Sequence, residues 1–261
     1  MDIDSWILHF RRNRQNRHEP DWQAPITLTP EVIAPLVRSL AQFQLGDGGG
    51  PAKLIAWNAN QFLSKSDRMR DVVGLWFEEE REHSRLLGAA VARFGGQSIE
   101  RHWSFTAFCL ARRLFGVRFE LTVLLLTEIV STVYYRLMRR HGADAALRAM
   151  CLLIIRDENG HVSFHCDRLA SLARAGKRRY GKLWRLRFQL LGLGAATMLW
   201  INHARALRAL GATRTEFYHE VRLGVSRFIA QLQLKLAAGA APSRSRLAAV
   251  QPVGAAESSG L

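Results

Sequence analysis

Two Glu-x-x-His motifs constrain the fold of this chain more than any other feature of its sequence. One is Glu80 with His83, and the other is Glu158 with His161. Residues three apart lie on the same side of a helix, so each carboxylate and imidazole can point at one place. Both motifs lie on apolar helical stripes, where an isolated charge is costly to bury. The side chains therefore need a common partner, and a divalent metal ion is the simplest one.

A lone acidic residue, Glu128, lies in a helical stretch between the two motifs. Its stripe is otherwise apolar, with Leu121 and Leu124 on the same face. A single Glu-x-x-His arises often by chance on a solvated helix face, whereas two copies with a buried Glu between them form a far more specific pattern. A shared metal site is the favoured interpretation, and a buried network of ion pairs is the alternative. Glu120, two turns before Glu128, is predicted to be solvated.

Helical signals run along almost the whole chain. Leu, Ala and Arg dominate, only 7 prolines occur, and no strand-like alternation stands out, so we expect an all-α fold. Thr29 and Pro30 form a good helix start, and Gly142 a good helix end. Residues 97–117 are interpreted as a crossover with room for a short helix. The longer helices are expected at residues 30–45, 67–94, 117–141, 144–176, 180–210 and 213–236.

These signals divide the chain into three parts. Residues 1–28 are interpreted as a variable lead-in with room for one short amphipathic helix. Residues 29–236 are expected to form the helical domain, with the candidate metal-binding core in 30–175 and two extra helices in 180–236. Residues 237–261 are rich in Ala, Gly, Ser and Pro, and we predict that they are disordered.

The order Glu-x-x-His, lone Glu, Glu-x-x-His resembles the ferritin-like di-iron carboxylate proteins. That family includes acyl-carrier-protein desaturases, ribonucleotide reductase small subunits, bacterial monooxygenase hydroxylases and arylamine N-oxygenases. The resemblance implies a ferritin-like four-helix bundle, here with two additional C-terminal helices. It also implies two iron ions, or a manganese or mixed iron–manganese pair, held by a Glu from each of two helices and a Glu-x-x-His from each of the other two. The residues that match this ligand set are Glu80, His83, Glu128, Glu158 and His161.

The family places a fourth carboxylate on the first core helix, and here the match is weaker. The sequence before Asp47 resembles the Gln-Leu-Gly-Glu stretch of bacterial ferritin-like proteins, with Asp in place of the final Glu. The resemblance therefore implies Asp47 as a ligand, although the glycines beside it weaken a helix. Glu31 is the alternative, but a carboxylate in a first helical turn is stabilised by the helix dipole and needs no metal.

The family also commonly has an acid immediately before the Glu of the last motif, and Asp157 occupies that position. Glu79 has the same position in the first motif. By this resemblance, Asp157 orients His83 and Glu79 orients His161, each through the ring nitrogen that faces away from the metal.

Three other side chains near the candidate metal ligands have more than one possible role. His165, one turn after His161, is either an extra ligand, as in some arylamine N-oxygenases, or a core histidine, and the core role is favoured. Tyr134 and Tyr135 are either packing aromatics or candidates for redox chemistry, and packing is far commoner.

Oxygen-rich ligation with two imidazoles suits iron or manganese better than structural zinc. Two such ions close together can react with dioxygen, while the protein supplies a dry pocket. We therefore expect a di-iron, oxygen-dependent oxidoreductase of the oxidase, monooxygenase or desaturase kind. Its substrate would be a small acyl or aromatic molecule, and its electron donor is unidentified. The alternative is a ferritin-like protein that binds or oxidises iron without an organic substrate, and a tunnel reaching the metals would favour the enzyme.

The chain is strongly basic, with a formal net charge of +15. The segment from Lys177 to Arg187 is rich in Lys and Arg, and carries Tyr180 and Trp184 at a spacing that favours one side of a helix. It is interpreted either as a solvated face or as a docking surface for an acidic carrier protein or an anionic membrane. Nucleic acid is not expected as a partner, because the basic charge is the only feature that favours nucleic-acid binding and no recognition motif occurs.

Cysteine usage and hydropathy indicate a cytoplasmic protein. Cys109, Cys151 and Cys166 occur singly, without disulfide or metal-ligand spacing. No signal-peptide pattern is seen at the start, and the longest apolar run, residues 190–201, is too short to span a bilayer and fits a buried or interfacial helix. Peripheral contact with a membrane and formation of a homodimer are both left open.

Overall fold

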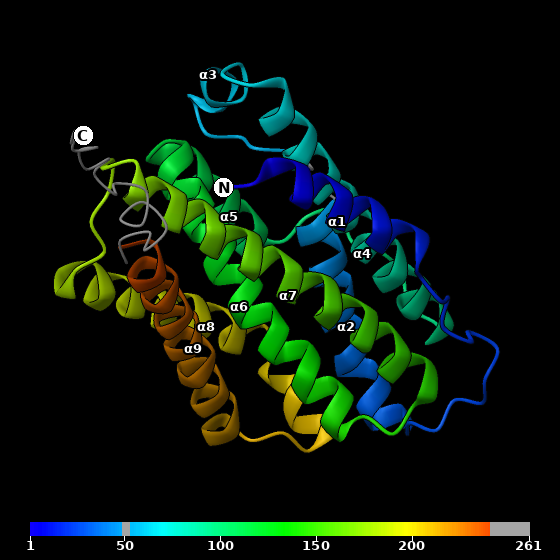
Figure 1. The fold of residues 1–261 in the computed structure, drawn as a ribbon. Helices are drawn as coiled ribbons and strands as arrows, with labels where there is room; N and C mark the ends of the chain where they lie inside the picture. The colour runs from blue at the N-terminus through cyan, green and yellow to red at the C-terminus, as the bar shows by residue number, and fades with distance from the viewer. Residues whose placement is uncertain (49–52, 241–261) are drawn as a thin grey trace, which may run out of the picture.

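A computed structural model describes residues 1–48 and 53–240. These residues form nine α-helices and no strand, so the expected all-α class is confirmed (Figure 1). In chain order the helices are α1 (Ile3–Gln15), α2 (Pro30–Gly48), α3 (Ala59–Leu63), α4 (Asp67–Arg93), α5 (Trp103–Leu114), α6 (Val117–His141), α7 (Ala145–Arg174), α8 (Lys182–Leu210) and α9 (Arg214–Ala240).

Capping residues set the ends of the helices that carry the two motifs. Ser66 caps α4 by accepting a hydrogen bond from the backbone N–H of Met69. Asp144 caps α7 by accepting from the N–H of Leu147. Helix α6 has the bounds that the sequence predicts, and the short crossover helix is present as α5.

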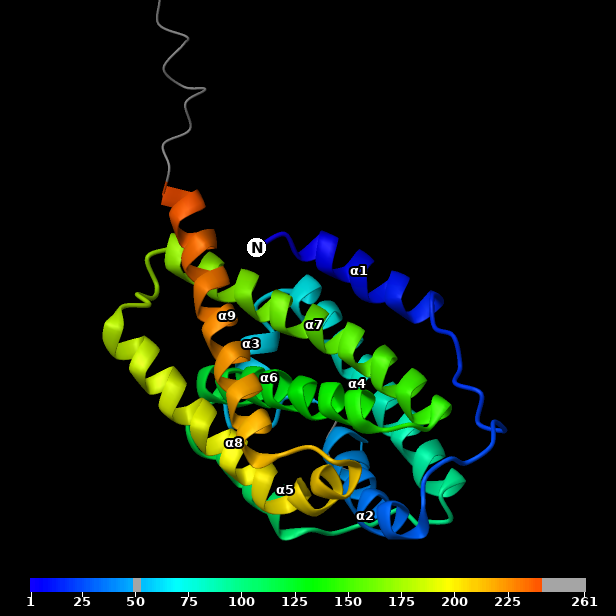
Figure 2. The same ribbon diagram turned by 90° about the horizontal axis from the view of Figure 1, so that it is seen from below.

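Two helix pairs, α2 with α4 and α6 with α7, form the centre of the molecule, and α4 also packs against α7. Helix α8 packs against α2 and α6, while α9 packs against α6 and α7 (Figures 1 and 2). One apolar core includes side chains from all six of these helices. The two C-terminal helices are therefore built into the same body as the four that precede them.

Residues 1–28 are more than a lead-in, because α1 packs along α4. Ile7 and Phe10 are buried, and the ring of Phe10 lies 6.0 Å from those of His161 and Phe164. The expected amphipathic helix is present, and it covers the side of the bundle that holds the second Glu-x-x-His motif.

Two predicted helix ends are wrong. Helix α2 continues past Leu45 to Gly48 because it packs closely on α4, where a Cβ at Gly48 would collide with Ser84. Helix α9 continues to Ala240, so residues 237–240 are helical and not disordered. The rest of the predicted disordered tail lies outside the described residues.

Helix α6 is long and apolar enough to cross a membrane by length and composition alone. In the fold, 72% of its most apolar window is buried inside the protein. Its apolar character is thus explained by its central position between α7, α8 and α9.

Glu120 is fully buried, so the prediction that it is solvated is wrong. Its carboxylate accepts hydrogen bonds from the Arg112 guanidinium at 3.0 Å and from the backbone N–H groups of Ile55 and Ala56 at 2.7 and 3.0 Å. These partners come from the segment before α3 and from α5, which no local periodicity could reveal. Glu120 thus ties both elements to α6.

We expect Glu120→Gln to destabilise the protein by about 1–3 kcal/mol, because a neutral amide cannot satisfy a buried guanidinium and two N–H donors equally well. Urea denaturation followed by circular dichroism measures the loss. Glu100→Gln is the control, since Glu100 is exposed and its replacement should change stability by less than about 0.5 kcal/mol. Equal stability of the two variants would show that the buried pair contributes little.

Candidate metal centre

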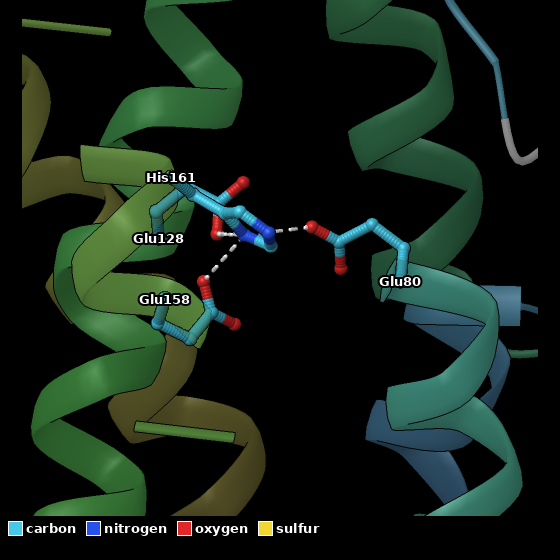
Figure 3. Close-up of side chains that lie close together, drawn as sticks. All are labelled: Glu80, Glu128, Glu158 and His161. Carbon is cyan, nitrogen blue, oxygen red and sulfur yellow. Dashed lines mark hydrogen bonds and ion pairs between the residues drawn. The ribbon is translucent and has the colours of Figure 1, made fainter. Parts of the chain in front are cut away.

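Six side chains from α2, α4, α6 and α7 converge inside the bundle. They form two groups, and in each the possible ligand atoms lie within 4.8 Å of one another. Glu80 belongs to both groups. The buried cluster of carboxylates and imidazoles could therefore hold a metal ion. The first group is Glu80, Glu128, Glu158 and His161, drawn in Figure 3, and the second is Asp47, Glu80 and His83.

The two histidines turn the same ring nitrogen toward the carboxylates. Nδ1 of His161 lies 3.2 Å from Glu80, 3.3 Å from Glu128 and 3.4 Å from Glu158 (Figure 3). Nδ1 of His83 lies 3.6 Å from Glu80 and 3.8 Å from Glu158. The imidazole ring centres are 5.8 Å apart. Both rings thus present a potential ligand atom to one common space.

The opposite ring nitrogens contact the two acids that the sequence analysis singled out. Nε2 of His83 lies 3.2 Å from Asp157, and Nε2 of His161 lies 2.9 Å from Glu79. The crosswise pairing expected from the sequence is therefore present. An Nε2–H that donates to a carboxylate leaves the Nδ1 lone pair free to bind a cation.

Arg17, which the sequence analysis missed, lies behind both acids. Its Nη2 is 2.8 Å from Asp157 and 3.4 Å from Glu79, and its side chain is only 12% exposed. Arg156 adds a second guanidinium 3.3 Å from Asp157. Two arginines therefore balance the two outer carboxylates. Nothing in the local sequence distinguishes Arg17 from the other arginines near it.

The inner carboxylates have no such balance. Among the described residues, no Lys or Arg forms an ion pair with Asp47, Glu80, Glu128 or Glu158. The ion-pair partners of the three glutamates are the two histidines. Burial and the neighbouring carboxylates raise the pKa of Glu158 well above its usual range. Burial opposes a charge on His161, but the carboxylates around it outweigh that effect and raise its pKa. The cluster thus lacks positive charge.

The donor set fits a bound metal cation. Asp47 Oδ2, Glu158 Oε2 and His83 Nδ1 are buried without a hydrogen-bond partner. Leaving buried polar atoms unsatisfied is costly, and a bound cation would satisfy them. Four buried carboxylates also supply negative charge that a bound cation would balance. The geometry and the charge therefore agree with the metal residues expected from the sequence.

The structure also separates the alternatives left open for Glu31 and His165. Glu31 is exposed in the first turn of α2, about four helical turns from Asp47 on the same helix, and lies in neither group. His165 is fully buried, but its ring packs edge-on against Trp76 at 5.0 Å and its Nδ1 contacts Arg168 at 3.2 Å. Asp47 is thus the carboxylate that α2 supplies, and His165 packs as a core histidine.

A cavity of about 500 Å³ reaches the four inner carboxylates. Most of its wall is apolar and comes from α5, α6 and α8, as at Phe108, Leu124 and Met198. Leu190 and Leu191 line it and are also 59% and 41% exposed, so the cavity opens to the surface along α8. Its volume lies within the usual range of small-molecule sites.

One polar group in the cavity wall was also missed by the sequence analysis. His203 of α8 lines the cavity, and its Nδ1 lies 2.8 Å from the Ser39 hydroxyl, which lies 2.5 Å from the Tyr134 hydroxyl. Burial lowers the pKa of His203 to about 3, so its imidazole is neutral at physiological pH. Tyr134 is thus tied into a hydrogen-bonded chain that ends at the cavity.

No model of a known protein family matches this chain, and no curated protein or solved structure matches it either. The features of the molecule that bear on function are therefore those of the site itself: its donor atoms, the groups behind them and the cavity that reaches them.

Proposed function

We propose that this protein is a ferritin-like di-iron oxidoreductase that uses dioxygen to oxidise an apolar, acyl or aromatic substrate. The observation that carries the proposal is the apolar cavity of about 500 Å³ that ends at the inner carboxylates. A protein that only stores or oxidises iron needs a path for hydrated ions, and an apolar cavity of this size does not provide one. Iron oxidation without an organic substrate is the alternative.

The order of the donor residues along the helices supports the ferritin-like part of the proposal. Helices α2, α4, α6 and α7 contribute, in turn, Asp, Glu-x-x-His, Glu and Glu-x-x-His. That order resembles the di-iron carboxylate bundles, in which inward-facing Glu and Glu-x-x-His residues hold the metals.

Asp47, Glu80 and His83 would hold one ion, and Glu80, Glu128, Glu158 and His161 the other. Carboxylate oxygens with one imidazole per ion favour iron or manganese over zinc. When bound as Fe(II), the pair supplies two electrons and open coordination positions for the reduction of dioxygen. Glu79, Asp157 and Arg17 would fix the histidine rings from behind.

The rest of the cavity would bind and orient the substrate. Its apolar wall excludes water and favours a hydrocarbon chain or an aromatic ring. His203 in the cavity wall offers the substrate one polar contact. Its Nδ1 is hydrogen-bonded to Ser39, so Nε2 is the ring nitrogen that can contact the substrate. The cavity thus suits a substrate that is mostly apolar and carries one polar group.

The overall reaction needs an external electron donor. Hydroxylation or N-oxygenation combines one dioxygen, two electrons and two protons with the substrate and releases one water, and desaturation with the same inputs releases two. A separate reductase would supply the electrons. The three cysteines are unpaired, which agrees with a reducing, cytoplasmic location.

A cavity-filling variant tests the proposal against its alternative. Gly194 lines the cavity, and a Cβ added there meets nothing within 4 Å, so Gly194→Phe should fill the cavity without disturbing α8. We expect Fe(II) binding and oxidation to be retained. Oxidation of an organic substrate, found by screening long-chain acyl and aromatic compounds for stimulated oxygen consumption, should fall at least about tenfold, which corresponds to about 1.4 kcal/mol.

Gly74→Phe is the matched control. Gly74 also has open space around its Cβ position but is exposed on α4, outside the cavity. This variant should keep full activity. If no compound stimulates oxygen consumption while iron is oxidised continuously in the parent and in both variants, the protein is an iron oxidase without an organic substrate.

A further inference from the structure

Exposed apolar side chains gather on two helices. Among the described residues, 15 large hydrophobic side chains are exposed, and 11 of them lie on α8 or on α5 and its flanks. Trp57 belongs with α5, because it lies beside Gly116, just after that helix. A concentration of exposed apolar side chains on two helices indicates an interaction surface. The 11 side chains are Trp57, Trp103, Leu110, Leu114, Phe115, Leu183, Leu186, Leu190, Leu191, Leu193 and Ile201.

On both helices the exposed apolar stripe lies beside the wall of the cavity. Leu183, Leu186, Leu190 and Leu193 recur at three- or four-residue intervals, so they share one face of α8. Leu190 belongs both to this stripe and to the cavity wall. On α5, Trp103, Leu110 and Leu114 form a stripe in the same way, next to the cavity-lining Ala107 and Ala111. The patch therefore borders the opening of the cavity.

The charge on the α8 side of the patch has one sign. Residues 177–210 contain 8 Lys or Arg and no Asp or Glu. Helix α5 contributes Arg113, since its other base, Arg112, is buried in an ion pair with Glu120. The bases nearest the start of α8 are exposed. The surface is thus apolar in its middle and basic at its edge. The exposed bases are Lys177, Arg178, Arg179, Lys182, Arg185 and Arg187.

Tyr180 and Trp184 of the basic segment do not form the apolar part of a docking surface, as the sequence suggested. Tyr180 is buried and lies 4.8 Å from Trp184, which stacks on Phe188 at 5.0 Å. These side chains pack the start of α8 against the core. The leucine stripe, not Tyr180 and Trp184, is the apolar part that faces outward.

An anionic bilayer fits this surface better than a protein partner. Two copies of the chain would bring two basic edges together, and like charges repel. An acidic carrier protein would match the basic edge but not the broad leucine and tryptophan surface. A bilayer offers anionic headgroups for the bases and hydrocarbon for the leucines, and Trp is enriched where the two regions meet.

We infer that α5 and α8 form a membrane-docking surface, on which the exposed stripes dip into an anionic phospholipid bilayer. The cavity opening beside Leu190 then faces the lipid. An apolar substrate can pass from the bilayer to the site without crossing water. This last step rests on the proposed function, whereas docking itself does not.

Vesicle sedimentation tests the docking with the full chain. The parent should pellet with phosphatidylcholine vesicles that contain phosphatidylglycerol, and much less with phosphatidylcholine alone. Binding should weaken as NaCl rises through the physiological range, where the Debye length falls to about 8 Å. The Leu186→Gln, Leu193→Gln double variant should lower the partition coefficient at least about tenfold, since each change removes apolar area from the stripe.

Two leucines outside the patch provide the control. Leu152 and Leu234 are 49% and 72% exposed, so the Leu152→Gln, Leu234→Gln variant removes as many exposed leucines and should bind as the parent does. Identical binding by the two double variants would overturn the proposal. So would a homodimer, detected by sedimentation equilibrium, that the patch variant abolishes while the parent ignores vesicles. Binding to polyglutamate but not to vesicles would also overturn it.

The readout is independent of the metal site. His161→Ala should bind vesicles like the parent, even though we expect it to lose metal. The patch variant should still oxidise a substrate dispersed in detergent. Loss of vesicle binding with retained oxidation would therefore separate this surface from the proposed enzyme activity.

Discussion

The purified protein, loaded with Fe(II) without oxygen, is expected to bind close to two iron ions per chain, and His161→Ala to lose most of them. Nδ1 of His161 lies within 3.4 Å of three carboxylates, so its removal takes a ligand from the most crowded part of the cluster. Elemental analysis after gel filtration measures the metal content. Thermal unfolding gives a second readout, because metal at about a hundredfold excess over its Kd stabilises a protein by about 2.7 kcal/mol.

His203→Gln is the control for the loss of a buried imidazole. His203 is as close to fully buried as the inner carboxylates, but it lies in neither ligand group. This variant should keep its iron and its metal-dependent stabilisation. Full iron content in His161→Ala would refute the assignment, as would tight zinc binding by the parent with no affinity for iron.

Arg17→Gln is expected to destabilise the protein by about 3–5 kcal/mol and to weaken metal binding by about 10–100-fold. The variant leaves Glu79 and Asp157 buried with less positive charge beside them, and both acids hold the histidine rings. Urea denaturation measures the first effect, and metal titration against a competing chelator measures the second.

Arg14→Gln is a closely matched control, three residues away in the same segment. Arg14 pairs with Glu78, the neighbour of Glu79, but both side chains are exposed, at 73% and 42%. Such a pair contributes less than about 1 kcal/mol, and metal binding should not change. If the two variants prove equally stable and bind metal equally well, Arg17 does not support the site.

The sequence was sufficient to predict which side chains converge inside the bundle, because the relevant pattern is local. A Glu and a His three residues apart on an apolar stripe can be recognised without knowing the fold, and the caps of α4 and α7 are equally local. The position of Asp47 was harder to predict. Helix α2 continues through the glycines beside it, and this depends on the close packing of Gly48 against Ser84 of α4.

The contacts that could not be predicted join distant parts of the chain. Glu120 was predicted to be solvated, and its burial depends on Arg112 and on the segment before α3. Arg17 lies in a segment that has no motif. The leucines of α8 show a further limit, since an apolar stripe has the same period whether it faces the core or the outside.

The position of α1 also bears on the stage of synthesis at which the candidate metal site becomes complete. The backbone carbonyl of Asn16 accepts a hydrogen bond from Arg156 across 140 residues, and Arg17 reaches Asp157 in the same place. In a nascent chain, the contacts from Arg17 to Asp157 and from Asp157 to His83 therefore cannot form until α7 has left the ribosome. Contacts between such distant residues carry a large loop-closure entropy, which slows their formation. Under the proposed function, metal would then be taken up by the nearly finished chain, and a nascent chain that ends before α7 would not retain iron.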